Sequence, residues 1–455
     1  MADQLSTSLK VGWGFGSFGS ITMMYLTSFF ALFFMSTFLG IDPAIGGSIL
    51  FFTRLLNIAT DPLIGLWSDR TNTRWGRRRP FMFAGGILAG LACISLFNVP
   101  NFESQSLLIA YLSVVMVVYF TAYTIFNLPY LAMPAEMTQS YHERTSLMTW
   151  RVIFVSAAGF AGLWLAPTIV KLAGGGRGGY ETMAVIMGFL LMASMIFAVF
   201  ATRNAKFTSF EVPNYTLMEQ IKTAAANRPF VLLSVAKLIQ LTGLACTTAT
   251  LPFLVKYGMD SSTIPGWLVA LGIVSLLSAY GLILNGASII TLPIWTYFAK
   301  SMEKHHLFVI AIAGYGICGL TWWFADLSEP FIVYALRCIA LGIFTGGVLL
   351  TGQSMLPDAI AYDHVRTGLR REGIFSGIYS FVEKIALATG PLIIGFLLSF
   401  MGFVESTGES VQQSESAIRA IYIGIGLLAP FFALASIPFL LMYDLTEDKL
   451  QIDTA

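Results

Sequence analysis

Three polar residues interrupt an apolar run between residues 44 and 68 and could bind a cation. Arg54, Asn57 and Asp61 are spaced i, i+3 and i+7, so they share one face of a helix. A carboxylate inside an apolar span costs roughly 2.5–3.5 kcal/mol, which favours a function or a partner for Asp61. Asn57 and Asp61 could coordinate a small cation through oxygen atoms, or Asp61 could take up and release a proton. A structural pair of Arg54 and Asp61 is the alternative, although a rise of roughly 10 Å between them makes direct pairing difficult.

A second polar strip lies in the run AYTIFNLPY, near the end of the apolar span 106–133. Tyr123, Asn127 and Tyr130 share a helix face, Thr124 is their neighbour, and Pro129 leaves a backbone carbonyl free at that level. An amide, hydroxyl groups and an aromatic face can together bind a polar organic solute. Polar contacts between helices are the alternative.

Cationic side chains in two further apolar runs are candidates for solute binding. Arg151 lies about one turn inside the run 147–172, where the alternative is that its side chain extends to the membrane interface. Lys237 lies deep in the run 229–256, close in sequence to Gln240 and Thr242. It could face a central cavity or pack against a neighbouring helix.

An acidic and a basic residue are adjacent in the run 373–402. Glu383 shares a helix face with Tyr379, and Lys384 shares another with Ser380, because neighbouring residues project about 100° apart. Exposing either charge to lipid is costly. We therefore expect at least one of these two pairs to line a central cavity.

The composition is that of a polytopic membrane protein. Of the 455 residues, 56% are hydrophobic and 11% are charged, against about 25% charged in ordinary soluble domains. The net charge of +1 gives no indication of a nucleic-acid partner. No three histidine or cysteine donors share a helix face, and there is neither a Walker-type motif nor a nucleophile–base pair. We therefore expect no metal, no cofactor and no enzymatic activity.

Twelve apolar runs are long enough to cross the hydrocarbon core, which takes about 20 helical residues. They cover residues 11–39, 44–68, 80–99, 106–133, 147–172, 182–201, 229–256, 266–298, 307–325, 330–355, 373–402 and 418–443. The run 266–298 contains Asn285 and Gly286, so it is expected either to be kinked or to extend beyond the bilayer. The pattern predicts two six-helix halves, 1–201 and 229–455, joined by a linker, 202–228, with a short amphipathic helix from Thr216 to Ala225.

Charged residues in the loops predict the orientation in the membrane. Basic residues gather on one side, which is predicted to be cytoplasmic: Arg70, Arg74, Arg77, Arg78, Arg79, Arg144, Arg203, Lys206, Lys222, Lys300, Lys304, Arg366, Arg370 and Arg371. The opposite loops carry Asp42, Glu103, Asp326, Glu329, Glu405 and Glu409. Both termini are predicted to be cytoplasmic. The start, MADQLSTSL, lacks the features of a signal peptide, so the first span is expected to be retained.

Several motifs together resemble the glycoside-pentoside-hexuronide:cation symporters, the family of the melibiose permease within the major facilitator superfamily. The motifs are DP with the later Gly65, TNTRWGRRRP, AYTIFNLPY, Arg151 and the stretch from MLPDAIAYD to GLRREGIFSGIYSFVEK. The resemblance covers essentially the whole chain. It implies a major facilitator fold of twelve transmembrane helices in two six-helix halves, and a secondary carrier.

The resemblance also implies roles for individual residues. Cation binding is implied for Asp61 and Thr124, with Lys384 close by, and sugar binding for Arg151. Asn57 and Asn127 stand where the family has acidic residues, and the run GSFGSITMM offers only Ser20 and Ile21 where the family has a sugar-binding aspartate. We therefore expect weaker sodium binding than in the melibiose permease and a different solute. Coupling to H+, coupling to Na+ and uncoupled movement all remain open.

The sequence thus predicts a carrier of a sugar or glycoside-like solute, coupled to a monovalent cation, acting as a monomer surrounded by lipid in a bacterial inner membrane. Residues expected to bind the solute are Arg151, Asn127, Tyr123, Ser20, Lys237, Tyr379 and Ser380, and those expected to bind the cation are Asp61, Asn57, Thr124, Asn127 and Lys384. Residues expected to act in gating are Arg54, Arg70, Arg77, Arg78, Asp358 and Arg371, with the loop from Arg70 to Arg79 contacting the loop from Asp358 to Arg371 in one state. Two alternatives are a carrier of an anionic or amphipathic solute, such as a sugar acid or lysolipid, and a membrane sensor that transports nothing.

Overall fold

The computed structural model describes residues 5–71, 73–138, 140–203, 205, 217–367, 369, 371–408 and 411–445, with all their side chains except those of Leu66, Asp69, Ala135, Tyr141, His142, Arg144, Thr145, Leu217 and Glu372. Lys206, Thr216, Arg370 and Glu409, which were named above, lie outside the described residues. Every regular element in the described residues is helical. The prediction of an all-α protein is confirmed.

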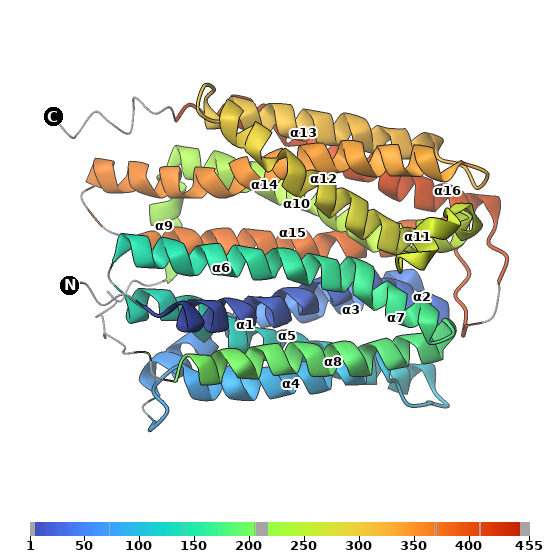
Figure 1. Cartoon of the computed structure of the whole chain (residues 1–455), viewed down its shortest axis with the longest axis horizontal. Helices are drawn as coiled ribbons and strands as arrows, with labels where there is room; N and C mark the ends of the chain where they lie inside the picture. Colours follow the sequence, from blue (N-terminus) through green and yellow to red (C-terminus); the bar gives the residue numbers. More distant parts are fainter. Residues whose placement is uncertain are drawn as a thin grey trace. The chain divides into compact units, whose positions relative to one another are not determined.

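The α-helices alternate with short connections along the chain (Figure 1). They are α1 (Thr7–Leu26), α2 (Leu32–Phe38), α3 (Pro43–Arg70), α4 (Arg79–Phe97), α5 (Gln105–Met137), α6 (Tyr141–Phe160), α7 (Ala166–Leu172), α8 (Gly176–Ala201), α9 (Leu217–Ala225), α10 (Arg228–Phe253), α11 (Gly266–Ala270), α12 (Leu276–Phe298), α13 (Lys304–Leu320), α14 (Phe331–Thr367), α15 (Glu372–Phe400), α16 (Glu415–Ile423), α17 (Ala429–Ala435) and α18 (Ile437–Leu441). Short 3-10 turns lie between α10 and α11, at Ser261–Thr263, and between α13 and α14, at Thr321–Phe324.

Eleven helical segments in the described part of the chain are long and apolar enough to cross a membrane. They agree with eleven of the twelve runs predicted from the sequence. The twelfth run, 44–68, is helix α3, which is 28 residues long but is not among the eleven. Helix α3 is nevertheless long enough to span a bilayer, since about 20 helical residues suffice.

The chain divides into two compact units. Unit 1 comprises Met1–Val212, Gly266–Gly281 and Val404–Gln412, and unit 2 comprises Pro213–Pro265, Leu282–Phe403 and Gln413–Ala455. In unit 1, α4 packs against α5 and α8, α1 against α6 and α8, and α3 against α5. In unit 2, α10 packs against α15 and α17, and α13 against α14 and α17.

Glycine residues allow close helix contacts in both units. A Cβ atom added at Gly85 of α4 would lie 2.6 Å from the backbone nitrogen of Phe126 on α5. One added at Gly342 of α14 would lie 2.5 Å from the carbonyl oxygen of Leu284 on α12. Because helix association in lipid depends on close packing, these small residues fix which helices become neighbours.

The predicted run 266–298 is interrupted, but not at the residues that the sequence suggested. The helix stops after Ala270 and resumes at Leu276, with Gly272 at a φ of 83° between them. That positive φ suits glycine and ends the first helical segment. Asn285 and Gly286 lie inside the continuous helix α12.

Four spans in the described part of the chain contain a π-helical segment that hydropathy alone does not predict. These segments are Thr27–Ala31, Ala161–Leu165, Leu254–Gly258 and Gly424–Leu428. Such insertions disturb the regular helical hydrogen bonds and are frequent at functional sites.

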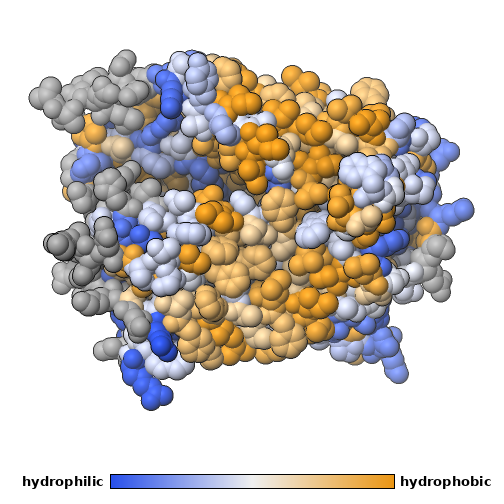
Figure 2. Space-filling model, viewed as in Figure 1, coloured by the Kyte–Doolittle hydropathy of each residue, from blue (hydrophilic) through white to orange (hydrophobic). Residues whose placement is uncertain are grey.

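The surface shown in Figure 2 is mainly apolar along the middle of the helices and hydrophilic near their ends. Exposed large apolar side chains include Phe189, Phe197 and Phe200 of α8 in unit 1, and Leu336 of α14 and Phe431 of α17 in unit 2. So much exposed apolar surface is unusual for a soluble protein and fits contact with lipid.

Candidate functional site

Helices α3 and α5 bring Asn57, Asp61 and Thr124 together inside unit 1. The Thr124 hydroxyl donates to Asp61 Oδ1 at 2.9 Å and accepts from Asn57 Nδ2 at 2.9 Å. Asn57 Nδ2 also donates to the carbonyl oxygen of Phe120 at 3.0 Å. Asn57 and Thr124 are buried, with exposed fractions of 5% and 1%, and Asp61 is partly exposed. The cluster therefore orients one carboxylate with neutral hydrogen-bonding groups.

This oxygen-rich cluster suits a monovalent cation or a proton. It contains carboxylate, amide and hydroxyl oxygens, which are hard ligands. Among the described residues, no group of three or more histidine, cysteine, aspartate or glutamate side chains could hold a metal ion. A multi-carboxylate site for a divalent cation is therefore not found in the described part of the chain.

Arg54 lies on the same helix but does not pair with Asp61. Its Nη2 donates to Met24 Sδ at 3.7 Å, and its guanidinium carbon lies 4.9 Å from the centre of the Phe120 ring. The side chain is buried, with an exposed fraction of 7%. Arg54 is thus held by contacts with α1 and α5 in the interior of unit 1.

The predicted solute-binding residues on α5 occupy different environments. Tyr123 and Asn127 are half-buried. Tyr130, by contrast, is fully buried and stacks on Trp13 of α1 with ring centres 4.7 Å apart. Of this strip, Tyr123 and Asn127 keep side-chain surface that a solute could contact.

Helices α1 and α6 connect two other predicted solute-binding residues. Ser20 is buried, and its hydroxyl donates to the carbonyl oxygen of Ser17 at 3.3 Å. The Ser17 hydroxyl in turn lies 3.2 Å from the carbonyl oxygen of Arg151. Arg151 is half-buried, and its Nε has no hydrogen-bond partner among the described residues. Of the pair, Arg151 has the group with unused hydrogen-bonding capacity.

Lys237 lies in the interior of unit 2. Its Nζ donates to Gln240 Oε1 at 3.3 Å and lies 5.4 Å from the centre of the Phe308 ring on α13. A Cβ atom at Gly352 of α14 would lie 2.8 Å from that Nζ, so the glycine leaves space for the ammonium group. With an exposed fraction of 5%, Lys237 is more deeply buried than its proposed role in solute binding would suggest.

The predicted residues of α15 differ in exposure. Tyr379 is buried, with no hydrogen-bond partner for its hydroxyl among the described residues, whereas Ser380 is exposed. Glu383 and Lys384 are half-buried. This helix therefore supplies both a buried hydroxyl and partly accessible charges to unit 2.

The arginines that follow α3 are held by an acidic residue of α5. Arg78 donates to Glu136 Oε1 through Nε at 3.1 Å and Nη2 at 2.9 Å, and Arg77 Nη2 lies 3.5 Å from the same oxygen. Arg78 Nη1 also donates to the Ser68 hydroxyl at 3.2 Å. Arg70, in the last turn of α3, is exposed. Within unit 1, this carboxylate ties the arginine-rich loop to α5.

The predicted gating residues of unit 2 also form ion pairs within that unit. Lys304 Nζ lies 2.7 Å from Asp358 Oδ2, and Arg371 Nη2 lies 2.8 Å from Asp363 Oδ1. The partners Glu136 and Asp363 were missed in the sequence. The available signal was an acidic residue at the arginine-rich end of a span. Contact between the two loops remains a prediction.

The family model described as "MFS/sugar transport protein" matches residues 12–447 of the chain. The chain belongs to this family. Membership confirms the resemblance seen in the sequence, the class of carrier and the prediction that the protein is not an enzyme.

Proteins named as transporters or putative transporters are similar to this family member over nearly its whole length. The putative glycoside/cation symporter YagG of Escherichia coli is 27% identical, over 98% of this chain and 94% of the relative. The isoprimeverose transporter of Lactiplantibacillus pentosus is 26% identical, over 94% and 87%. The glucuronide carrier protein homolog of Escherichia coli is 25% identical, over 99% and 95%.

Solved transporter structures share the fold of this family member. The nucleoside transporter NupG has a TM-score of 0.62 at 12% identity, with 96% of this chain and 98% of that chain covered. A bacterial homologue of the lysosomal transporter Spinster has a TM-score of 0.63 at 13% identity, with 96% and 94% covered. These similarities confirm the major facilitator fold.

Proposed function

We propose that the protein carries a sugar or glycoside-like solute across a membrane together with a monovalent cation, H+ or Na+, by alternating access. The observation that carries this proposal is the hydrogen-bonded cluster of Asp61, Thr124 and Asn57. A carboxylate that accepts a hydrogen bond from a neutral hydroxyl within a membrane-spanning unit is a suitable site for a coupling ion. The relatives named as a glycoside/cation symporter and an isoprimeverose transporter support the same class.

Asp61 is the proposed coupling residue, with Thr124 and Asn57 as neutral ligands. Asn127 is placed with them because it lies one turn beyond Thr124 on α5. Lys384 is proposed to compete with the cation for the carboxylate. One carboxylate offsets less of the dehydration of Na+ than three would, so the affinity for Na+ should be low.

The solute is proposed to contact Tyr123, Asn127 and Arg151 in unit 1. Hydroxyl, amide and guanidinium groups match the hydroxyls of a sugar. Ser20, Lys237, Tyr379 and Ser380 complete the proposed set. Their differing burial implies that Ser380 contacts the solute more readily than Lys237 does.

A carrier of an anionic solute, such as a sugar acid, is the second candidate. Arg54 is buried without a carboxylate partner among the described residues, and the buried Lys237 ammonium has a neutral hydrogen-bond acceptor. The relative named as a glucuronide carrier homolog agrees with this possibility. Inhibition of uptake by sugar acids, without inhibition by neutral glycosides, would favour a carrier of an anionic solute.

We further propose that the protein acts as a monomer in the lipid of a bacterial inner membrane, with both termini cytoplasmic. The basic residues clustered in one set of loops support this orientation. Arg70, Arg77, Arg78, Asp358 and Arg371 would then act on the cytoplasmic side during gating. Their ion pairs within each unit would rearrange as the cycle proceeds.

Proteoliposomes test the function directly. The wild type should concentrate a radiolabelled glycoside in response to an inward H+ or Na+ gradient and should also catalyse counterflow. Asp61→Asn should lose concentrative uptake but retain counterflow, because exchange does not require net ion movement. If the wild type shows no counterflow with any member of a broad panel of glycosides and sugar acids, the transport proposal is wrong and a sensor becomes the better hypothesis.

A further inference from the structure

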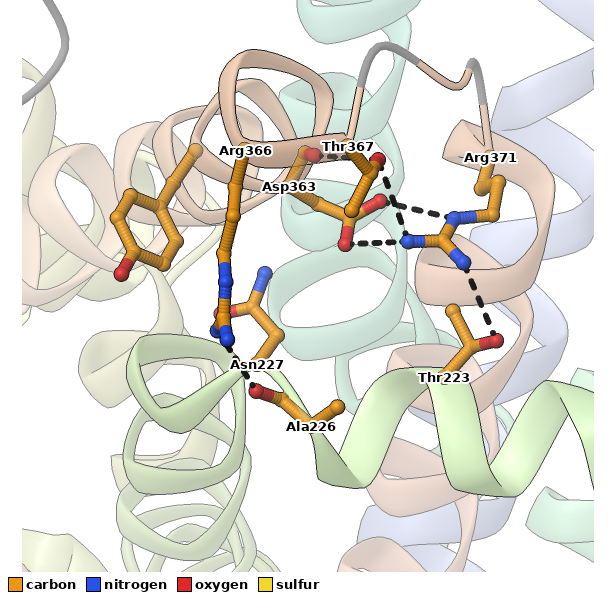
Figure 3. Close-up of a pocket in the computed structure, with 8 residues that line it drawn as sticks. Thr223, Ala226, Asn227, Asp363, Arg366, Thr367 and Arg371 are labelled. Atoms are coloured by element: carbon orange, nitrogen blue, oxygen red, sulfur yellow. Dashed lines mark hydrogen bonds and ion pairs between the residues drawn. The ribbon is translucent and has the colours of Figure 1, made fainter.

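A polar hollow in unit 2 lies apart from every residue proposed above to bind solute or cation. Its volume is about 160 Å³, and it is formed by α9, the connection between α9 and α10, the end of α14 and the residue before α15 (Figure 3). The lining residues are Thr223, Ala226, Asn227, Tyr362, Asp363, Arg366, Thr367 and Arg371. Two guanidinium groups and one carboxylate leave this lining with a formal charge of +1.

One wall of the hollow is rigid and electrically neutral. The Arg371 guanidinium forms a two-pronged pair with Asp363, from Nη2 to Oδ1 at 2.8 Å and from Nε to Oδ2 at 3.0 Å. Its Nη1 also donates to the hydroxyl of Thr223 on α9 at 3.5 Å. Asp363 is buried, with an exposed fraction of 6%. Such a paired fork is geometrically fixed, so it shapes the hollow without leaving Asp363 as a free negative charge.

The opposite wall carries a cation without a carboxylate partner. Arg366 is exposed, and its Nη1 donates to the carbonyl oxygen of Ala226 at a long 3.4 Å. No carboxylate of the described residues lies within ion-pair distance of its guanidinium. A guanidinium has five N–H donors, so most of the hydrogen-bonding capacity of Arg366 remains for a ligand.

Both polar atoms of the Asn227 side chain already form hydrogen bonds within the protein. Its Oδ1 accepts from the backbone nitrogen of Phe230 at 3.0 Å, and its Nδ2 donates to the carbonyl oxygen of Ala359 at 2.8 Å. The side chain therefore fixes the floor between α10 and α14. The lining also includes three residues with hydroxyl groups, Thr223, Tyr362 and Thr367, of which Thr223 accepts from Arg371.

We propose that this hollow binds the phosphate group of an anionic ligand, with Arg366 as the principal contact and the Arg371–Asp363 pair as the fixed wall. Guanidinium groups bind phosphate oxygens through parallel hydrogen bonds, and the net positive lining favours an oxyanion. The bound group would join α9 to the end of α14, because Arg366 and Ala226 belong to these two sides. Occupancy would thus stiffen the attachment of the linker helix, whether or not the proposed transport function is correct.

Phosphate titration of the full-length protein tests this proposal. The protein is placed in phosphatidylcholine nanodiscs, and inorganic phosphate replaces chloride at constant ionic strength. Isothermal titration calorimetry and the thermal unfolding midpoint should both report saturable binding to the wild type. Arg366→Gln should weaken it by at least about tenfold, as expected for loss of a charged hydrogen-bonding group.

Two variants and a second lipid sharpen the result. Arg203→Gln removes another exposed arginine, outside the hollow, and should change phosphate affinity by less than about twofold. Arg366→Lys keeps the charge but loses the planar fork, so its affinity should fall between those of the wild type and Arg366→Gln. Nanodiscs that contain phosphatidic acid distinguish a lipid ligand from a soluble one. If phosphatidic acid competes with inorganic phosphate for the hollow, the ligand is a lipid headgroup. If it does not compete, the ligand is a soluble phosphorylated molecule. The proposal is overturned if the wild type responds to phosphate no more than to chloride, or if Arg366→Gln binds phosphate as the wild type does.

Discussion

The hydroxyl oxygen of Thr124 lies 2.9 Å from Oδ1 of Asp61 and joins helix α5 to helix α3 within unit 1. Because the same hydroxyl accepts from Asn57 Nδ2, both its proton and a lone pair are used. Arg54 instead contacts Met24 and Phe120. The Asp61 carboxylate thus accepts a hydrogen bond from a neutral hydroxyl, whereas the nearest arginine in sequence lies against a sulfur atom and an aromatic ring.

Thr124→Val should weaken the binding of Na+ while preserving the fold. Valine has nearly the shape of threonine but cannot donate to Asp61. Loss of a hydrogen bond to a charged group costs about 1.5 kcal/mol or more, so the Na+ concentration for half-maximal uptake should rise by roughly tenfold. If the coupled ion is H+, uptake should instead persist to higher pH, because the carboxylate loses a bond that favours its charged form. Uptake into proteoliposomes, measured over a range of Na+ concentration and pH, checks this.

Two variants control for general effects on α5. Thr124→Ser keeps the hydroxyl and should remain close to the wild type. Thr121→Val changes a half-buried threonine one turn earlier and should leave the ion dependence unchanged. An unchanged ion dependence in Thr124→Val would show that the hydrogen bond to Asp61 has no role in coupling.

Asn57→Asp should increase the affinity for Na+. The change places a second carboxylate beside the Thr124 hydroxyl, and two carboxylates offset the dehydration of Na+ better than one. The Na+ concentration that gives half of the maximal thermal stabilisation should fall by about tenfold. Asn101→Asp adds the same charge in an exposed loop and should not alter it. If Na+ stabilises Asn57→Asp no better than the wild type, Asn57 does not lie at a sodium site.

The fold could be predicted largely from hydropathy, because backbone groups in lipid must be satisfied within helices. The interruption between Ala270 and Leu276 was not located in advance. Asn285 and Gly286 looked like the weaker point, yet a helix can accommodate both. The positive φ of Gly272 depends on a turn whose geometry one residue's identity does not reveal.

The site could be predicted only where residues share one helix. The spacing of Asn57 and Asp61 placed them on a common face of α3, as the structure shows. Their hydrogen bonds to Thr124 depend on how α3 packs against α5, which single-helix periodicity does not specify. The same reason explains why Glu136 was missed as the partner of Arg78, since 58 residues separate the two in sequence.

Glu136→Gln should lower stability. Arg78 and Glu136 are largely buried, with exposed side-chain fractions of 13% and 10%, so the change weakens a shielded pair and leaves Arg77 and Arg78 with a neutral acceptor. We expect a loss of roughly 1–3 kcal/mol, measured as a lower thermal unfolding midpoint in detergent. Glu181→Gln, which weakens the more exposed pair with Arg177, should cost less than about 1 kcal/mol. Equal losses in the two variants would contradict a structural role for Glu136 in holding the loop.

Glu143→Gln should remove a contribution to stability that depends on pH. Glu143 Oε2 lies 2.9 Å from Lys10 Nζ and accepts from the Leu5 backbone nitrogen at 2.9 Å. The hydrogen bonds to the Lys10 side chain and to this nitrogen lower the pKa of Glu143 below its usual value. A lowered pKa in the folded state means that the contribution to stability is present above the unfolded pKa of about 4.3 and is lost as the pH falls through the folded pKa.

The thermal unfolding midpoints of the wild type and Glu143→Gln should therefore differ at neutral pH and become equal in acid. The control Glu103→Gln, in an exposed loop, should show no such change. A difference that is the same at both pH values would show that Glu143 acts through its shape and not through its charge.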